Sequence, residues 1–97
     1  MLVKDIQPRQ GKIDISLKII ILEEAREFDK FGKKLRVCNA IAEDEEGGKI
    51  KLTLWNDEID KVKEGDQVKI TNGYCSEFQG EKQLSAGKFG QLEVLKA

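Results

Sequence analysis

The sequence predicts an all-β fold, a small barrel of five strands with one short helix between the third and the fourth strand. Three observations predict it. Apolar and polar residues alternate with a period of two in several short segments, and glycine-containing turns separate these segments. Only residues 56–62 have the apolar spacing and the charge order of a helix. A chain of 97 residues is the size of one domain, which we expect to span residues 1–97.

The strands and turns follow from this pattern in order. The five predicted strands cover residues 13–22, 35–42, 49–55, 68–78 and 83–95. The last two are each interrupted once, by the glycine-containing segments 72–73 and 87–90. We expect a charged loop at 23–34, an acidic turn at 43–48 and a hairpin turn at 79–81.

Packing expectations complete the predicted fold. The apolar run 19–22 indicates a first strand that is long, bent and buried on both faces there. Asn56 or Asp57 is expected to cap the helix at 56–62. Residues 3–8 are expected to form a strap that closes one end of the barrel. This order of elements is typical of a five-stranded OB-fold Greek-key barrel with a short helix between strands 3 and 4.

Composition excludes several classes of function. The chain has no histidine, and its two cysteines, Cys38 and Cys75, form no CxxC-type pair, so we expect no metal site and no cofactor. Neither a phosphate-binding GxxxxGK[ST] loop nor a nucleophile elbow is present, so an enzyme is not expected. The longest apolar stretch, 19–22, is too short to span a membrane. We therefore expect a cytoplasmic protein with free thiols.

Aromatic residues give the clearest indication of function. Trp55 has the opposite strand phase to Ile50, Leu52 and Leu54, so it is expected to point away from the core. An exposed tryptophan is well suited to stack on a nucleobase. Tyr74 and Phe78, four residues apart on one strand, share a face, and Phe28 of the first loop is a fourth candidate. In the alternative interpretation, Trp55 packs on the edge of the barrel or on the helix, and Tyr74 or Phe78 plugs a barrel end.

Positive charges must be sorted onto one face if the chain binds nucleic acid, because its net charge is −1. Lys49, Lys51 and Lys69 have the outward phase of the third and fourth strands and are expected to neutralise phosphates. Further phosphate-binding candidates flank the first loop and the last hairpin: Lys33, Lys34, Arg36, Lys82 and Lys88. For any single lysine, an ordinary solvated surface is the alternative.

Several runs of the chain together resemble a known family. These runs are 51–55, 62–66, 72–74, 76–80 and 83–85, together with the opening residues 3–8. They resemble the OB domains of archaeal single-stranded DNA-binding proteins and of archaeal replication protein A. The resemblance implies a barrel that binds single-stranded DNA largely independently of sequence in replication, recombination or repair. It places stacking positions on Trp55, Tyr74 and Phe78, whereas Ser85 stands where some relatives carry a further aromatic. It also implies other OB domains and replication and repair proteins as partners.

Two alternative functions remain open at this stage. An RNA-binding OB module would use the same face, because stacking does not read the sugar. A protein-interaction OB domain of a multi-OB assembly would instead cover the three rings with a partner. Competition between matched DNA and RNA oligomers distinguishes the first alternative, and tryptophan quenching by oligo-dT distinguishes the second.

Overall fold

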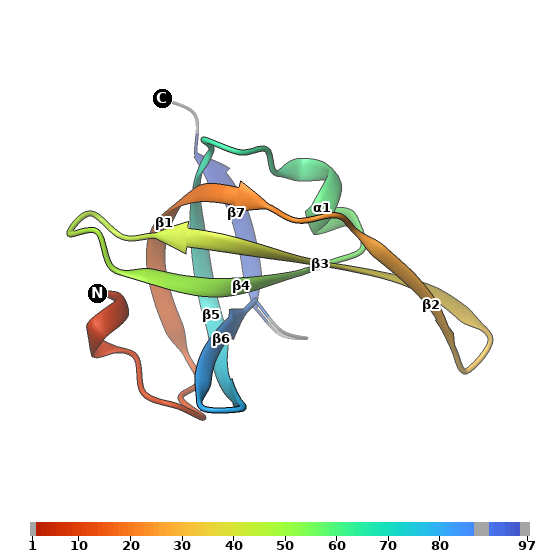
Figure 1. Cartoon of the computed structure of the whole chain (residues 1–97), viewed down its shortest axis with the longest axis horizontal. Coiled ribbons are helices and arrows are strands. Elements are labelled where there is room, and N and C mark those ends of the chain that lie inside the picture. The colour runs from red at the N-terminus through yellow and green to blue at the C-terminus, as the bar shows by residue number, and fades with distance from the viewer. Residues whose placement is uncertain (1, 87–89, 96–97) are drawn as a thin grey trace.

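The body of the molecule is a curled sheet, which closes because its first strand pairs with its fifth (Figure 1). The computed structural model describes residues 2–86 and 90–95, without the side chains of Asp57 and Phe78. Its elements in chain order are the 3-10 helix η1 (Val3–Asp5), β1 (Ile13–Leu22), β2 (Arg26–Lys30), β3 (Lys33–Glu43), β4 (Lys49–Trp55), α1 (Asp57–Lys61), β5 (Gln67–Phe78), β6 (Glu81–Ser85) and β7 (Gln91–Leu95).

The pairing of these strands confirms the predicted OB fold. Neighbouring strands run in the order β1-β3-β4-β6-β5, and β1 also pairs with β5. β4 and β6 pair in parallel, while the other pairs named here are antiparallel. The five predicted strands correspond to β1, β3, β4, β5 and the two halves β6 and β7. The short helix α1 lies between β4 and β5 as predicted.

Alternation decides which side chains enter the barrel. In β4, Ile50, Leu52 and Leu54 are buried, and the residues between them are partly or largely exposed. β1 shows the same alternation over its first seven residues. Full burial of one such side chain stabilises the folded state by about 1.5–3 kcal/mol. Slipping β4 by one residue would move all three apolar side chains into water, so the core fixes which face of β4 points outward.

A bulge in β5 confirms the predicted interruption at 72–73. Between Ile70 and Gly73, β5 advances by three residues while β1 advances by two. Asn72 takes a positive φ of 55° within this bulge. A Cβ atom on Gly73 would lie 2.6 Å from the Ile70 side chain and 3.1 Å from the Ser85 carbonyl oxygen. Glycine therefore permits the close approach of the strands at this bend.

A second irregularity corrects the interpretation of β1. The register with β3 shifts between Ile19 and Ile21. Ile19 is fully buried, whereas 48% of Ile21 is exposed. The prediction that the run 19–22 is buried on both faces is therefore wrong, because the shift turns Ile21 to the outside.

The prediction of a charged loop at 23–34 is wrong in part. It contains β2, which pairs with the start of β3 to form a hairpin that projects away from the barrel (Figure 1). All five residues of β2 are exposed. A strand without a buried face has no apolar–polar alternation, so the pattern that identifies the other strands is missing here. We refer to β2 and residues 31–36 together as the arm.

The start of α1 also differs from the prediction that Asn56 or Asp57 caps the helix. Asn56 has a positive φ of 50°, and its side chain makes no hydrogen bond to cap α1. Its Oδ1 instead accepts a hydrogen bond from the Arg36 backbone N–H at 3.0 Å. The carboxylate of Glu58 accepts a hydrogen bond from the backbone N–H of Trp55, also at 3.0 Å.

The described part of the chain contains no helix with the length and apolarity that a membrane crossing requires.

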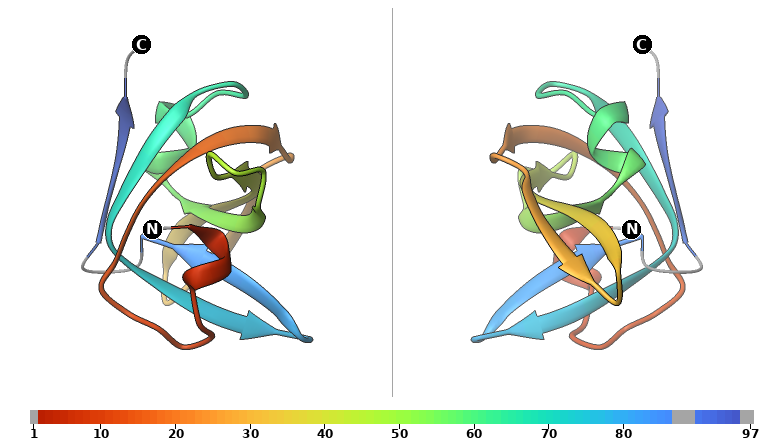
Figure 2. Two further views of the ribbon diagram at one scale, coloured as in Figure 1. Left: turned by 90° about the vertical axis from the view of Figure 1, so that its left-hand side faces the viewer. Right: turned by 90° about the vertical axis from the view of Figure 1, so that its right-hand side faces the viewer.

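The N-terminal segment packs against the barrel as the predicted strap. Val3 and Ile6 are buried in the hydrophobic core, and the two views of Figure 2 show this segment lying beside β5 and β6. Lys82 donates a hydrogen bond from Nζ to the Ile6 carbonyl oxygen at 2.9 Å. The strap is thus held by both apolar burial and polar contacts.

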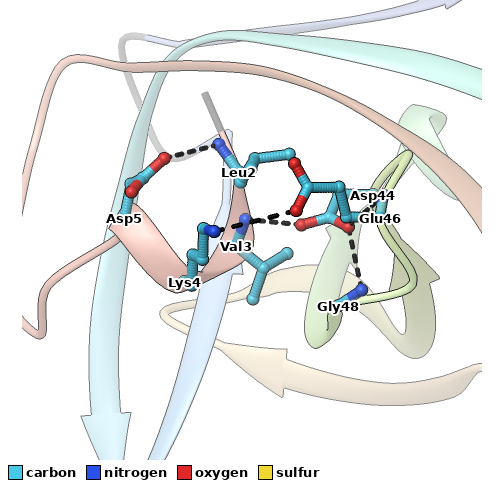
Figure 3. Close-up of polar contacts among 7 residues, drawn as sticks. All are labelled: Leu2, Val3, Lys4, Asp5, Asp44, Glu46 and Gly48. Atoms are coloured by element: carbon cyan, nitrogen blue, oxygen red, sulfur yellow. Dashed lines mark hydrogen bonds and ion pairs between the residues drawn. The ribbon is translucent and has the colours of Figure 1, made fainter.

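Asp44 is the second polar anchor of the strap (Figure 3). One carboxylate oxygen, Oδ2, accepts the Val3 N–H at 2.7 Å. The other, Oδ1, accepts the backbone N–H groups of Glu46 and Gly48 at 2.9 and 2.8 Å. The hydrogen bond from Val3, helped by those from Gly48 and Glu46, lowers the pKa of Asp44 despite its burial. The predicted acidic turn at 43–48 therefore contains a buried carboxylate whose two oxygens both accept hydrogen bonds.

Candidate nucleic-acid interface

A groove crosses the outer face of β3, β4 and β6. Its volume is about 610 Å³. The side chains that line it come from the strands and from the β5–β6 turn: Arg26, Val37, Asn39, Lys51, Thr53, Trp55, Gln79, Glu81 and Gln83. The groove is therefore lined by one aromatic ring, several amide or hydroxyl groups and charges of both signs.

Strand register explains why residues far apart in sequence meet here. Asn39 lies opposite Thr53, and Thr53 lies opposite Ser85. Ser85 in turn lies opposite Tyr74. These four residues form one row across β3, β4, β6 and β5, and Trp55 lies one strand repeat further along β4. Strand geometry places the Cα atoms of Trp55 and Tyr74 about 12 Å apart on the same outer face.

The rings on this face are accessible. Trp55 is 37% exposed, Tyr74 46% and Phe28 39%. The outward orientation predicted for Trp55 is thus confirmed, while its role in stacking stays a prediction. Phe28 contacts Trp55 with its ring at a centroid distance of 6.2 Å and an interplanar angle of 75°. This edge contact restrains the indole without requiring that it enter the core.

Phe78 and Lys88 cannot be placed in the same way. The backbone of Phe78 lies at the end of β5 opposite Glu81, but its side chain lies outside the described residues. Lys88 also lies outside them. Both stay predictions.

Lys51 is the lysine that the structure places in the groove. Its Nζ lies 3.6 Å from Oε2 of Glu81, which lines the groove from the start of β6. Lys49, one strand repeat earlier on β4, is exposed. Lys49 and Lys51 border a second, smaller hollow of about 270 Å³ next to Val3 and Lys82. Two of the predicted phosphate-binding lysines therefore lie at one end of the aromatic face.

Comparison with known proteins decides the family. Residues 6–94 match the family model described as single-stranded DNA binding protein Ssb-like, OB fold. This chain belongs to that Ssb-like family. The result confirms the predicted relationship to archaeal single-stranded DNA-binding proteins.

Individual relatives agree with the Ssb-like assignment. The single-stranded DNA binding protein Ssb of Saccharolobus solfataricus is 33% identical over 85 residues, which cover 88% of this chain and 57% of that protein. The chain thus spans little more than half the length of this relative. The second OB-fold domain of replication protein A from Methanococcus maripaludis matches with a TM-score of 0.79 at 21% identity, covering 100% of this chain and 95% of the other. A replication protein A heterotrimer bound to single-stranded DNA matches with a TM-score of 0.74 at 17% identity, covering 100% of this chain and 25% of the other. These two structures confirm the fold.

Other predicted cations of the Ssb-like chain lie away from the groove. Lys69 lies opposite Ser16 of β1 and Glu93 of β7. It borders a hollow that also contains Asp14 and Glu43. Lys69 has the outward phase, as predicted, but its strand neighbours belong to another side of the barrel.

Arg36 and Lys82 are engaged in structural contacts. The Arg36 guanidinium donates to both carboxylate oxygens of Asp60, at 2.7 and 3.2 Å, and to the Asn56 carbonyl oxygen at 3.2 Å. Hydrogen bonding to Arg36 lowers the pKa of Asp60. Lys82 holds the strap, as described above. Lys33 and Lys34 lie on the arm, and both are exposed.

Sequence reasoning missed the polar lining of the groove. Asn39, Thr53 and Gln83 line it from β3, β4 and β6, and Gln79 and Glu81 lie at the β5–β6 end. The signal was the strand phase: Asn39, like Thr53, lies between two buried residues, and Gln83 lies next to the buried Leu84. The strand phase alone could not identify the groove, because the register between strands decides which outward-facing residues lie on the same face.

The remaining ionisable groups have structural explanations. Burial raises the pKa of the Glu58 carboxyl, and the hydrogen bond from the Trp55 N–H offsets this only partly. Cys38 and Cys75 are buried free thiols whose pKa values are raised by burial. Within the described ranges, no three side chains of the metal-binding types come together as a metal site.

Proposed function

We propose that this chain binds single-stranded DNA largely independently of sequence, as one OB unit spanning residues 1–97, in replication, recombination or repair. The observation that carries the proposal is the pair of exposed rings, Trp55 and Tyr74, on one outer face beside a groove. Membership of the Ssb-like family supports the same ligand. Other OB domains and replication and repair proteins are the partners we propose.

Stacking accounts for binding without sequence preference. Each base that stacks on an aromatic ring contributes about 1–3 kcal/mol, and every base offers a flat π face. We propose that Trp55 and Tyr74 hold successive segments of the strand, with Phe28 beside Trp55 and Phe78 as a further platform. Asn39, which lies opposite Thr53 at the β3 end of this row, offers both a donor and an acceptor to a base edge that passes it.

Charge has a secondary role in this proposal. Lys51 and Lys49 neutralise phosphates at one end of the face, while the other sequence-predicted cations lie on the arm or elsewhere. Few phosphate contacts mean a shallow dependence of affinity on salt. A binding mode in which stacking dominates and two lysines assist is compatible with the net charge of −1.

Tryptophan fluorescence tests the proposal directly, because Trp55 is the single tryptophan of the chain. Titration with oligo-dT is expected to quench its emission, since the base stacks on the indole. Matched oligo-U in the same titration distinguishes an RNA-binding module, which would bind it at least as tightly. An unchanged spectrum with both oligomers would favour a protein-interaction domain.

Glu81 gives a second test, because its carboxylate competes with phosphate for Lys51. We expect Glu81→Gln to tighten oligo-dT binding by about 2- to 5-fold at low salt, since it frees the ammonium and removes a repulsive charge from the groove. The measurement is the dissociation constant from fluorescence titration. Glu93→Gln, which removes the same charge from β7 on another side of the barrel, is the matched control and is expected to change little. Unchanged or weaker binding by the Glu81 variant would contradict the role given to Lys51.

A further inference from the structure

The chain leaves β4 through a residue in a strained conformation. Asn56, directly after Trp55, has a φ of 50° and a ψ of −117°. These angles are close to those of the first central position of a type II′ turn, which glycine adopts without strain. A strained residue persists only where its surroundings hold it in place, and such residues gather at functional sites. The contacts of Asn56 therefore indicate what the strain secures.

Arg36 holds Asn56 from the neighbouring strand. The Asn56 backbone N–H donates a hydrogen bond to the Arg36 carbonyl oxygen at 3.0 Å. In return, the Arg36 backbone N–H donates to the side-chain Oδ1 of Asn56 at 3.0 Å, where a regular antiparallel ladder uses the backbone carbonyl. That carbonyl oxygen instead accepts hydrogen bonds from the Arg36 guanidinium at 3.2 Å and from the Ile59 N–H at 3.1 Å. The turn after β4 is thus fixed through both the backbone and the side chain of Arg36.

Asp60 of α1 fixes the guanidinium in turn. Both of its carboxylate oxygens accept hydrogen bonds from Arg36, at 2.7 and 3.2 Å, so the pair is bidentate. The ion pair joins α1 to the base of the arm, beside which α1 lies (Figure 1). The Asp60 side chain is 63% exposed, and an exposed ion pair adds little to the stability of a fold. The pair is therefore better explained by what it positions.

Trp55 is the residue that these contacts restrain. On the β3 side, the hydrogen bonds between Arg36 and Asn56 close the ladder directly beyond Trp55. On the other edge of β4, the pairing with β6 ends at Thr53, and the Glu58 carboxylate accepts the Trp55 N–H at 3.0 Å. Although Trp55 is the last residue of its strand, its backbone is held at both edges. The direction in which the indole leaves the strand follows from this backbone.

We propose that Arg36 and Asp60 are positioning residues for Trp55, and that together with Asn56 they form a clamp that holds the indole ready for stacking. A mobile strand end would have to be ordered when a base stacks on it, and the clamp removes this cost before binding. The clamp acts through the ring and touches no nucleic acid itself, so Arg36 has a role other than the phosphate contact that the sequence predicted. This inference rests on the proposed function, because it concerns the orientation of the same stacking ring.

Two substitutions distinguish a positioning clamp from a phosphate contact. Asp60→Ala removes an acid and releases the guanidinium, and alanine suits the helix. Arg36→Lys keeps the positive charge but cannot form the bidentate pair. If Arg36 bound phosphate, the first variant would bind oligo-dT more tightly and the second would change little. The clamp predicts instead that both dissociation constants rise by about 2- to 10-fold, the ordering cost of one side chain.

Glu45→Ala is the matched control for the removal of an acid. Glu45 is exposed in the turn between β3 and β4, on the hollow that contains Lys69. Its loss changes the net charge as Asp60→Ala does but leaves the clamp intact. Oligo-dT binding by this variant is expected to stay unchanged or to become slightly tighter.

Asn56→Gly tests the strained residue itself. Glycine adopts the positive φ without strain, which offsets the lost hydrogen bond from Arg36 to Oδ1, so the melting temperature is expected to change little. The end of β4 loses one of its restraints, so the indole is expected to move more and oligo-dT to bind more weakly. Unchanged indole motion in this variant would contradict the clamp.

The motion of the indole separates positioning from a merely structural role. Time-resolved fluorescence anisotropy of Trp55, the single tryptophan, reports its motion within nanoseconds. Well below the melting temperature, the variants at Arg36, Asn56 and Asp60 are expected to show a larger fast component than the unmodified chain. A lower melting temperature with unchanged indole motion and affinity, or tighter binding by Asp60→Ala, would overturn the proposal. If the unmodified chain did not bind oligo-dT, the proposed function would fail, while the anisotropy would still show whether the clamp restrains the ring.

Discussion

Replacing Trp55 by alanine is expected to weaken binding of oligo-dT by about 5- to 150-fold, which corresponds to about 1–3 kcal/mol, while the fold stays intact. The binding loss follows from removal of the indole that lines the groove beside β3. The fold survives because Trp55 points away from Ile50, Leu52 and Leu54, which fill the barrel. Anisotropy of a labelled oligomer measures the affinity, since the variant lacks the intrinsic fluorophore.

Trp55→Phe is the natural control for this experiment. It keeps a flat ring on β4 and is expected to retain most of the affinity. The melting temperature of Trp55→Ala should fall only slightly, through loss of the edge contact with Phe28. An unfolded alanine variant would mean that the indole supports the barrel, and a folded variant with full affinity would remove Trp55 from the interface.

Asp44→Asn is expected to weaken the attachment of the strap and to lower the melting temperature by about 5–10 °C. The amide retains an oxygen for the N–H groups of Glu46 and Gly48, which Oδ1 accepts in the unmodified chain. The NH₂ group then faces the Val3 N–H, so two donors oppose each other where the carboxylate had accepted a bond. Thermal unfolding followed by circular dichroism measures the effect.

The dependence on pH identifies the cause of this loss. The pKa of Asp44 is lowered in the folded chain, so its contribution to stability is fully present above the unfolded pKa of about 3.9 and is lost as the pH falls through the lower folded value. The Asn variant has no such titration. Its melting temperature should therefore approach that of the unmodified chain as the pH falls below about 4. Glu46→Gln, at the exposed ion pair with Lys4, is the control and should change the melting temperature little. A constant difference between the Asp44 variant and the unmodified chain at all pH values would contradict the assignment.

The sequence predicted the barrel and the outward tryptophan for the same physical reason. Where one face of a strand is buried, alternation is strict, and β4 shows it over its whole length. Trp55 could therefore be assigned to the outside from the sequence, whereas for Tyr74 the sequence left both an outward ring and a plug at the barrel end open. The bulge at Asn72 was also foreseeable, because the Asn-Gly pair favours positive φ and permits close contact between strands.

Features that depend on register or on distant partners were not predictable in this way. Lys69 has the correct phase, but β5 curves, so its neighbours are Ser16 and Glu93 and not the aromatic rings. Asn56 is a residue type that often caps helices, yet its side chain accepts a hydrogen bond from a backbone N–H of β3 instead. Asp44 resembles its acidic neighbours in sequence, but in the fold it is buried and accepts a hydrogen bond from Val3, 41 residues away.

The position of β6 has a consequence for how the chain matures. Trp55 and Tyr74 lie on strands that follow each other in sequence, but β6 is inserted between β4 and β5 in the sheet and joins them. Until residues 81–85 have been synthesised and have left the ribosome, the two rings have no common surface. If the two rings bind nucleic acid as proposed, a nascent chain would gain this affinity only after β6 has docked between β4 and β5.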